Sequence, residues 1–323
     1  MNELLFTVVL ALAWFGAVNV LLSAAAAATG WLIERGVVRP RPDMAPRILL
    51  GLKLLPGAVA LAFIFVVFLP AQWRFEPKGA EESLGYTLGA LAALGGVTIA
   101  LAARRSLRDA RLTRRLEREW QARATGPRLA DGPLPVYCLP DAAPIISLAG
   151  VRRARVFVAR PVLAAFSADE LAVSLAHEHA HHEAHDNLKR VLVACSPDLL
   201  GMWPAGRRLE RCWRVAVEFA ADARAVNGSE ERAVSLASAL LKVARLAPAI
   251  GAPLAGSGFY DGTLLWARID RLLAPAGTPV PPPMSRRLSL SIAAMSVLAA
   301  FAAAEGAWLG VHLATEGLVR FLP

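Results

Sequence analysis

Five of the six histidines of this chain fall within residues 177–185, which read His-Glu-His-Ala-His-His-Glu-Ala-His. Inside this stretch, His177, Glu178 and His181 form the pattern His-Glu-x-x-His. Because positions i and i+4 share one face of a helix, the two imidazoles are placed to bind one zinc ion. The glutamate between them then lies beside the metal, where it can act as general base toward a water molecule. The spacing therefore predicts metal-assisted amide hydrolysis.

A catalytic zinc site needs three protein ligands and one open position, and three ligands rarely fit on one straight helix. Glu218 is the predicted third ligand, because it lies in a separate stretch of helical character. Asp222 follows one turn later on the same face and is predicted to accept a hydrogen bond from a ligand imidazole, which fixes its tautomer. Glu178 is expected to take a proton from the activated water and pass it to the leaving amine, while zinc polarises the scissile carbonyl.

The other residues of the histidine stretch are given different roles. His179, His182 and His185 are interpreted as solvated residues or as neighbours of the ligands. His181 with His185 is an alternative i,i+4 pair, but it leaves no glutamate in the base position. Asp186 is interpreted as a structural residue that pairs with a nearby arginine.

Local signals place the motif on a helix. Residues 167–170, Ser-Ala-Asp-Glu, form a capping box at the start of a helix that runs into the histidine stretch. Strands are predicted at 136–139 and within 145–158, the latter as a hairpin, and 126–135 as loop. The hairpin is either an ordinary core element or an exposed edge to which a substrate adds as a strand. Further helices are expected at 104–124, 206–226, 229–247 and 262–274.

Hydrophobic residues make up 56% of the chain, and they are concentrated in long runs. Because about 20 apolar residues are enough to cross about 30 Å of hydrocarbon, four transmembrane helices are expected. The second run contains one charge, Lys53, near one end, where its side chain could snorkel. Residues 191–203 are apolar but too short to cross, which favours a buried or interfacial segment. The four runs are Leu4–Ile33, Ile48–Leu69, Leu84–Ala103 and Leu288–Leu309.

The first run can also be interpreted as a signal peptide, because small residues at 23–26 offer a cleavage site. However, residues 1–3 carry no positive charge, and the run is much longer than a typical signal core. Both features favour a retained helix.

The distribution of charge predicts the orientation of the chain. Arginines follow the first run and cluster directly after the third, and Arg286 and Arg287 precede the fourth. By the positive-inside rule, both chain ends lie outside and the region between the third and fourth spans is cytoplasmic. The expected fold is mainly α. Its predicted parts are three transmembrane helices in 1–103, a cytoplasmic domain in 104–287 with a Pro-rich linker at 275–283, and a fourth transmembrane helix with a short external tail in 288–323.

The formal net charge of +9 raises the question of nucleic-acid binding. The arginine-rich stretch 104–128 directly follows a predicted span and has few interleaved aromatic residues, so topology anchoring and attraction to anionic headgroups explain it. A solvated or headgroup-facing side is also expected for Arg207, Arg208, Arg211 and Arg214. No nucleic-acid partner is expected. In a reducing compartment the three cysteines are expected to form no disulfide.

Several of these features together resemble the membrane-embedded gluzincin metallopeptidases. The similarity rests on the sequence Ser-Ala-Asp-Glu-Leu at 167–171, on the His-Glu-x-x-His motif, on His-Asp-Asn at 185–187, and on Glu218-x-x-x-Asp222. The chain is most similar to the signal-transducer peptidase family of the β-lactam receptors (Bla and Mec type), and it also resembles the HtpX-like heat-shock proteases and the CAAX prenyl proteases. The resemblance implies a cytoplasmic α+β zincin-type domain between the third and fourth spans. It also implies zinc at His177, His181 and Glu218, with Glu178 as base and Asp222 beside the ligands.

The expected activity is that of an integral membrane zinc endopeptidase that cuts a cytoplasmic regulator or a membrane-proximal protein. The first alternative is an HtpX-like protease of membrane-protein quality control. The second is a non-catalytic zinc-binding signalling or scaffold subunit, although a structural zinc site needs no base at Glu178. Only residues 310–323 follow the fourth run in this sequence, so neither an external penicillin-binding sensor like that of the receptors nor direct β-lactam sensing is expected. The expected partners are a polypeptide substrate and the lipid bilayer.

Overall fold

Three of the four predicted apolar runs form long helices. The computed structural model describes residues 3–37, 44–75, 85–129, 134–140, 145–246, 262–274, 310–315 and 317. The first long helix is α1 (Glu3–Glu34), and the third is α4 (Tyr86–Arg123). The second begins as α2 (Ala45–Ala62), passes through a π-helical segment (Phe63–Phe68) and ends as α3 (Leu69–Phe75). All three are long and apolar enough to cross a membrane, as expected for the first three predicted spans.

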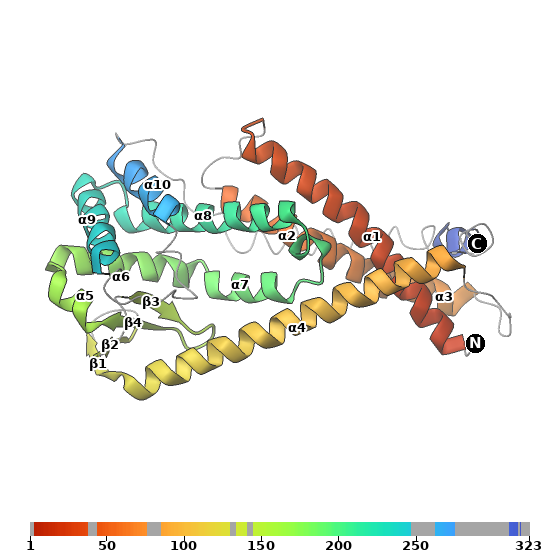
Figure 1. The fold of residues 1–323 in the computed structure, drawn as a ribbon, viewed down its shortest axis with the longest axis horizontal. Helices are drawn as coiled ribbons and strands as arrows, with labels where there is room; N and C mark the ends of the chain where they lie inside the picture. Colours follow the sequence, from red (N-terminus) through yellow and green to blue (C-terminus); the bar gives the residue numbers. More distant parts are fainter. Residues whose placement is uncertain are drawn as a thin grey trace.

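The fourth predicted span, 288–309, and the Pro-rich linker at 275–283 lie outside the described residues. Residues 310–315, which follow that span, are helical and lie near α3, at the end of the molecule farthest from the sheet (Figure 1). There the hydroxyl of Thr315 accepts a hydrogen bond from Trp14 Nε1 at 3.1 Å, and the His312 and Phe75 rings are 5.6 Å apart. The segment after the predicted fourth span is therefore held against α1 and α3.

The helices α1 and α4 touch through their backbones at two glycines. A Cβ atom added to Gly16 would lie 2.5 Å from the carbonyl oxygen of Leu91, and one added to Gly95 would collide with the carbonyl oxygen of Leu12. Close backbone packing at small residues is a main source of helix association where lipid competes with apolar side chains. This contact therefore sets how the first and third long helices cross.

Beyond its apolar part, α4 continues to Arg123, as predicted for 104–124, and leads into a four-stranded sheet. The strand order is β1-β2-β4-β3, with β2 parallel to β4 and the other pairs antiparallel. β3 and β4 form the predicted hairpin, and Gly150 in its turn has a positive φ of 92°. The strands are β1 (Thr125–Leu129), β2 (Val136–Leu139), β3 (Ile146–Ala149) and β4 (Arg155–Ala159).

The prediction of a loop over 126–135 was wrong for its first residues, which belong to β1. Gly126 and Pro127 indicated a loop, but the register of β1 against β2 shifts on both sides of Pro127. Such irregular pairing at a sheet edge tolerates a proline, because its missing N–H is not needed by a second neighbouring strand.

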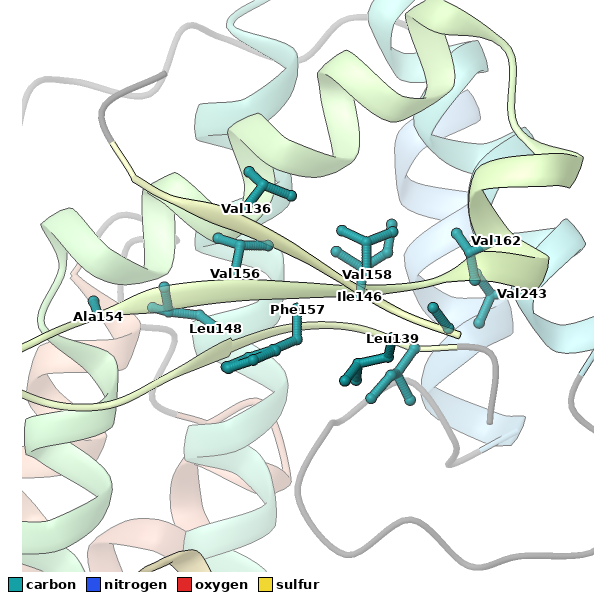
Figure 2. Packing of buried hydrophobic residues seen from close by; sticks show 12 residues of the cluster. Val136, Leu139, Ile146, Leu148, Ala154, Val156, Phe157, Val158, Val162 and Val243 are labelled. Atoms are coloured by element: carbon teal, nitrogen blue, oxygen red, sulfur yellow. The ribbon is translucent and has the colours of Figure 1, made fainter. Parts of the chain in front are cut away.

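An apolar cluster joins the sheet to the helices that follow it (Figure 2). Phe157 and Val158 of β4 are almost completely buried, together with Val162 of α5 (Arg160–Ala165) and Val243 of α9 (Glu230–Leu246). Leu171 and Leu175 of α6 (Ala168–Glu183) also pack against this cluster. The sheet therefore fixes the position of the helix that carries the histidine motif.

The remaining helices are α7 (Asp186–Cys195), a 3-10 turn (Leu199–Gly201), α8 (Pro204–Val226) and α10 (Gly262–Leu273). The predicted helices at 206–226, 229–247 and 262–274 are confirmed as α8, α9 and α10. In Figure 1, α8 runs alongside α2, and Leu209, Trp213 and Val217 of α8 share an apolar cluster with Leu49 of α2. The helices around the motif are thus packed directly onto the long apolar helices.

The expectation that Lys53 snorkels to a membrane surface was wrong. Lys53 is fully buried, and its ammonium nitrogen lies 3.4 Å from Asp198 Oδ1. Asp198 belongs to the segment between α7 and α8, within the stretch 191–203 that was predicted to be buried or interfacial. An acidic partner from another part of the chain therefore replaces contact with water.

We expect Gly95→Ala to destabilise the protein by about 1–3 kcal/mol, because the added methyl group has to push the α1 backbone away. Gly96→Ala is the matched control, since its Cβ would meet only the tip of the Leu12 side chain at 4.0 Å. Thermal unfolding of both variants in nanodiscs checks this expectation. Equal unfolding temperatures for Gly95→Ala and Gly96→Ala would show that the two backbones are not in close contact.

Candidate metal centre

The structure brings the three predicted metal ligands together from two helices. His177 and His181 project from α6, and Glu218 projects from α8. The two Nε2 atoms are 3.1 Å apart, and Glu218 oxygens lie 3.5 Å from His177 Nε2 and 3.7 Å from His181 Nε2. All three side chains are buried. They form the only group of this kind found among the residues that the structure describes.

The start of α6 is fixed by the predicted capping box. Ser167 Oγ accepts a hydrogen bond from the Glu170 backbone N–H at 3.2 Å, and Glu170 Oε2 accepts one from the Ser167 N–H at 2.7 Å. Glu170 also accepts hydrogen bonds from Ser238 and Lys242 of α9, each at 2.7 Å. The cap therefore sets both the first turn of α6 and its position against α9.

The Nδ1 atom of each candidate ligand imidazole contacts a carboxylate, on the side of the ring opposite Nε2. His177 Nδ1 lies 3.0 Å from Asp222 Oδ1, the arrangement predicted from the sequence, and His181 Nδ1 lies 2.8 Å from Asp186 Oδ2. A proton on Nδ1 leaves Nε2 with a lone pair that can bind a metal. Both Nε2 atoms face each other, so the two rings are oriented toward a common point.

The role of Asp186 differs from the predicted one. The sequence suggested pairing with an arginine, but Asp186 contacts His181 and accepts a hydrogen bond from Lys189 Nζ at 2.8 Å. The chain turns sharply at His185, which is exposed and has a left-handed φ of 56°, and this turn brings the start of α7 back to α6. The useful signal in the sequence was the short distance in the chain from His181 to Asp186.

Arg268 was not identified from the sequence, although it contacts both Glu218 and Asp222 of α8. This residue of α10 is 1% exposed and donates two hydrogen bonds to Asp222, at 2.6 and 2.8 Å. Its Nη1 also lies 3.2 Å from Glu218 Oε2. No periodicity or motif marks a single arginine many residues away, so only the folded chain reveals this pairing.

The side chain of Glu178 extends from α6 toward β3, the edge strand of the sheet. Its Oε2 accepts a hydrogen bond from the backbone N–H of Leu148 in β3 at 2.7 Å. The carbonyl oxygen of Leu148 accepts one from Asn187 Nδ2 at 3.2 Å. The strand therefore positions the predicted base and is in turn fixed by the first residues of α7.

The other histidines of the stretch are not drawn into the centre. His179 Nε2 lies 3.3 Å from Glu183 Oε1 on the outer side of α6, and His182 is half-buried. Neither these two residues nor the exposed His185 belongs to the group formed by His177, His181 and Glu218.

The carboxylates govern protonation at the centre. Burial favours the neutral form of His181, but Asp186 and then Glu218 outweigh it and raise its pKa to about 9. Burial likewise disfavours charge on His177, yet Asp222 and Glu218 raise its pKa as well. Burial would raise the pKa of Glu218, but the two histidines and Arg268 hold that pKa well below its usual range. The pKa of Asp222 is lowered in the same way, mainly by Arg268 against the effect of burial.

The geometry fits a zinc ion. Tetrahedral coordination with Zn–N distances of about 2.0–2.1 Å places neighbouring ligand atoms about 3.3 Å apart. The observed separations of 3.1, 3.5 and 3.7 Å lie close to that value. Without a metal, two Nε2 atoms at 3.1 Å have room for only one proton between them, and a divalent cation can take the place of that proton.

No protein-family model, curated protein or solved structure matches the chain. The chemistry of the centre therefore has to be inferred from its own residues and distances.

We expect Arg268→Met to destabilise the protein by about 3–5 kcal/mol, because it removes the buried cation that contacts two buried carboxylates, Asp222 and Glu218. Arg271→Met is the control on the same helix, since Arg271 is exposed and stacks on Phe219 with its guanidinium 4.8 Å from the ring centre. That contact is worth only about 0.5–1 kcal/mol. Thermal unfolding compares the two variants, and equal losses would show that Arg268 is not the counter-charge of Asp222 and Glu218.

In the metal-free protein, the free energy of unfolding is expected to fall as the pH rises from about 6.5 to about 9. A raised pKa in the folded state means that the folded protein binds the extra proton. The stabilisation is therefore complete below pH 6.5 and is lost above the folded pKa of His181. Unfolding in the presence of a chelator measures this slope. His181→Gln should flatten it, and an unchanged slope in that variant would contradict the assignment.

Proposed function

We propose that the chain is an integral membrane zinc endopeptidase whose catalytic centre consists of His177, His181, Glu218 and Glu178. The observation that carries the proposal is the set of separations between the two Nε2 atoms and the Glu218 oxygens, which suit tetrahedral zinc. Two features add support. The Nδ1 atom of each imidazole contacts a carboxylate, and Glu178 lies between the two histidines on α6. A zinc site with a purely structural role has no need for that glutamate.

His177, His181 and Glu218 would hold the ion through two neutral imidazoles and one carboxylate. Bound there, zinc supplies Lewis acidity that polarises a scissile carbonyl and lowers the pKa of a water molecule. Asp222 and Asp186 keep the Nδ1 protons of the imidazoles in place. Arg268 keeps Asp222 and Glu218 charged and oriented.

Glu178 is the proposed proton carrier. It takes a proton from the attacking water as the water oxygen bonds to the carbonyl carbon. It then delivers that proton to the amine nitrogen as the C–N bond breaks. The hydrogen bond from Leu148 holds its carboxylate at the edge of β3, where an extended substrate would pass.

The edge of β3 is the proposed substrate-binding strand. Leu148 directs both its N–H and its C=O away from β4, toward Glu178 and Asn187. Ile145 directs its C=O toward β4, where it bonds to Ala159 N. Because alternate residues of a strand face the same side, Ile146 presents its main-chain groups in the same direction as Leu148. A peptide that pairs with this edge through Ile146 therefore lies next to Glu178 and needs no particular sequence, and at Leu148 it would replace the hydrogen bonds to Glu178 and Asn187.

The proposed location is an inner membrane, with residues 104–287 forming a zincin-type domain on the cytoplasmic side. The arginines that follow the third long helix support this orientation. Substrates in this arrangement are cytoplasmic regulators or membrane-proximal polypeptides. The packing of α8 onto α2 supports a centre that works close to the membrane surface.

The test compares wild-type protein with Glu178→Gln in nanodiscs. Both are expected to hold stoichiometric zinc, whereas His181→Ala should lose it. When membrane vesicles are added and new peptide N-termini are profiled, Glu178→Gln should generate them about 100-fold more slowly or worse. Glu183→Gln on the outer side of the same helix is the matched control and should cleave normally. Equal processing by wild type and Glu178→Gln would overturn the proposal, as would wild-type protein without stoichiometric zinc.

A further inference from the structure

The segment between α7 and α8 is held by side chains from all three long apolar helices. We call this segment, Ser196–Trp203, the hairpin tip, because α7 leads into it and α8 leads back out (Figure 1). Asn19 of α1 donates to the carbonyl oxygen of Pro197 at 2.8 Å and accepts from the Leu199 N–H at 3.1 Å. Arg105 of α4 donates to the carbonyl oxygen of Ser196 at 2.7 Å. The irregular backbone of the tip thus finds its partners in protein side chains.

The charged groups at the tip are paired with one another. Asp198 Oδ1 lies 3.4 Å from Lys53 Nζ, and Asp198 Oδ2 lies 3.9 Å from Arg105 Nη2. Lys53 is also 3.9 Å from Glu210 of α8. Glu210 also pairs with the exposed Arg214 at 2.7 Å, so each of the two carboxylates lies next to cations, as expected where ionisable groups lie within or at a membrane and have to pair with one another.

The contacts from Asn19 and Lys53 place the tip beside the apolar parts of α1 and α2, whereas Arg105 lies just past the apolar run of α4 that ends at Ala103. Asn19 lies 15 residues before the end of α1 at Glu34, a distance of about 22 Å along the helix. Lys53 lies eight residues after the start of α2 at Ala45, about 12 Å into that helix. Non-helical backbone is tolerated at such a depth only where protein satisfies its polar groups, which is the case here.

The side chains that point away from the protein at this end of the hairpin are apolar. Leu192 is 46% exposed, Met202 45% and Trp203 37%. The long helices expose apolar residues as well, among them Ile48 of α2 and Leu101 of α4. In water these residues would form an unfavourable patch, whereas acyl chains cover them at no cost.

One to two turns farther along α8, the exposed side chains change from apolar to basic. Arg207, Arg208 and Arg211 are all exposed. At the end of α1 the Arg35 guanidinium lies 4.2 Å from the centre of the exposed Trp31 ring. Tryptophan at the boundary of the hydrocarbon and arginine at the phosphates are the usual order at a membrane surface.

We infer that α7 and α8 form a re-entrant hairpin whose tip is inserted into one leaflet of the bilayer. Leu192, Met202 and Trp203 contact acyl chains, and Arg207, Arg208 and Arg211 bind phospholipid phosphates. The partner of this surface is the phospholipid bilayer. The inference goes beyond the proposed zinc chemistry and does not depend on it, but it requires the three long helices to cross the membrane.

This arrangement also sets the height of the candidate centre. Glu218 follows Trp203 by 15 residues on α8, which is about 22 Å along the helix axis. The hairpin therefore acts as a spacer that keeps the centre outside the hydrocarbon and at a constant distance from it.

The test measures membrane depth at single nitroxide labels on the full-length protein in phosphatidylglycerol nanodiscs. The label is attached at Met202→Cys, in a background in which Cys138, Cys195 and Cys212 are replaced by alanine. Phe65→Cys in the second long helix is the reference for lipid exposure, and Val234→Cys on α9 is the reference for water exposure; the two native side chains are 66% and 58% exposed. Relaxation by oxygen is compared with relaxation by a water-soluble nickel complex.

At Met202, oxygen is expected to act more strongly than nickel, as at Phe65, and the ratio should be reversed at Val234. A label at Arg208→Cys should fall between Met202 and Val234. A nickel-dominated signal at Met202 would overturn the inference. Low accessibility to both reagents would also overturn it, because protein rather than lipid would then cover the tip. If Phe65 itself behaved like Val234, the membrane assignment would fail, independently of any zinc measurement. Trp203→Cys replaces Met202→Cys if the latter does not fold.

Discussion

Carboxylates that have lost contact with water have to be neutralised by nearby positive charge, and this constraint governs the surroundings of His177 and His181, the two candidate ligand histidines. Glu178, Asp186, Glu218 and Asp222 are all buried. An unpaired buried charge costs several kcal/mol, so the group is stable only as a balanced set. Without a metal, part of the balance comes from protons on the imidazoles, as the raised pKa of about 9 at His181 indicates. A divalent cation brings the same positive charge without those protons, so metal binding and imidazole deprotonation are linked.

The same constraint explains why so many separate elements meet at one place. α6 carries the histidines, α8 carries Glu218 and Asp222, α7 contributes Asp186, and α10 contributes Arg268. Each of these side chains lowers the cost of burying another, and none of them is stable there alone. Folding of the helices and formation of the centre are therefore one event. A change in the packing of α10 would alter the position and charge balance of Glu218 through Arg268, although α10 provides no candidate ligand.

What the sequence predicts well depends on local spacing. The His-Glu-x-x-His pattern, the pair Glu218 and Asp222, and the capping box at 167–170 all follow from the period of a helix, which is the same in every fold. The pairings of Arg268 with Asp222 and of Lys53 with Asp198 join distant parts of the chain, and no period encodes them. For the same reason, β1 was missed: its Gly and Pro indicate a turn locally, and only the partner strand makes it part of a sheet.

α7 and α8 each contribute to the candidate centre and also contact the long apolar helices. They therefore connect the centre physically with α1, α2 and α4. α7 has Asp186 at one end and leads at the other into Ser196, whose carbonyl oxygen is bound by Arg105. α8 begins near the buried pair of Lys53 and Asp198, and Glu218 lies farther along the same continuous helix. A helix transmits a displacement of one end to the other with little bending. The positions of Asp186 and Glu218 relative to each other are therefore determined partly by how α1, α2 and α4 are packed. A force on those helices that opened the hairpin would separate the third candidate ligand from the two histidines.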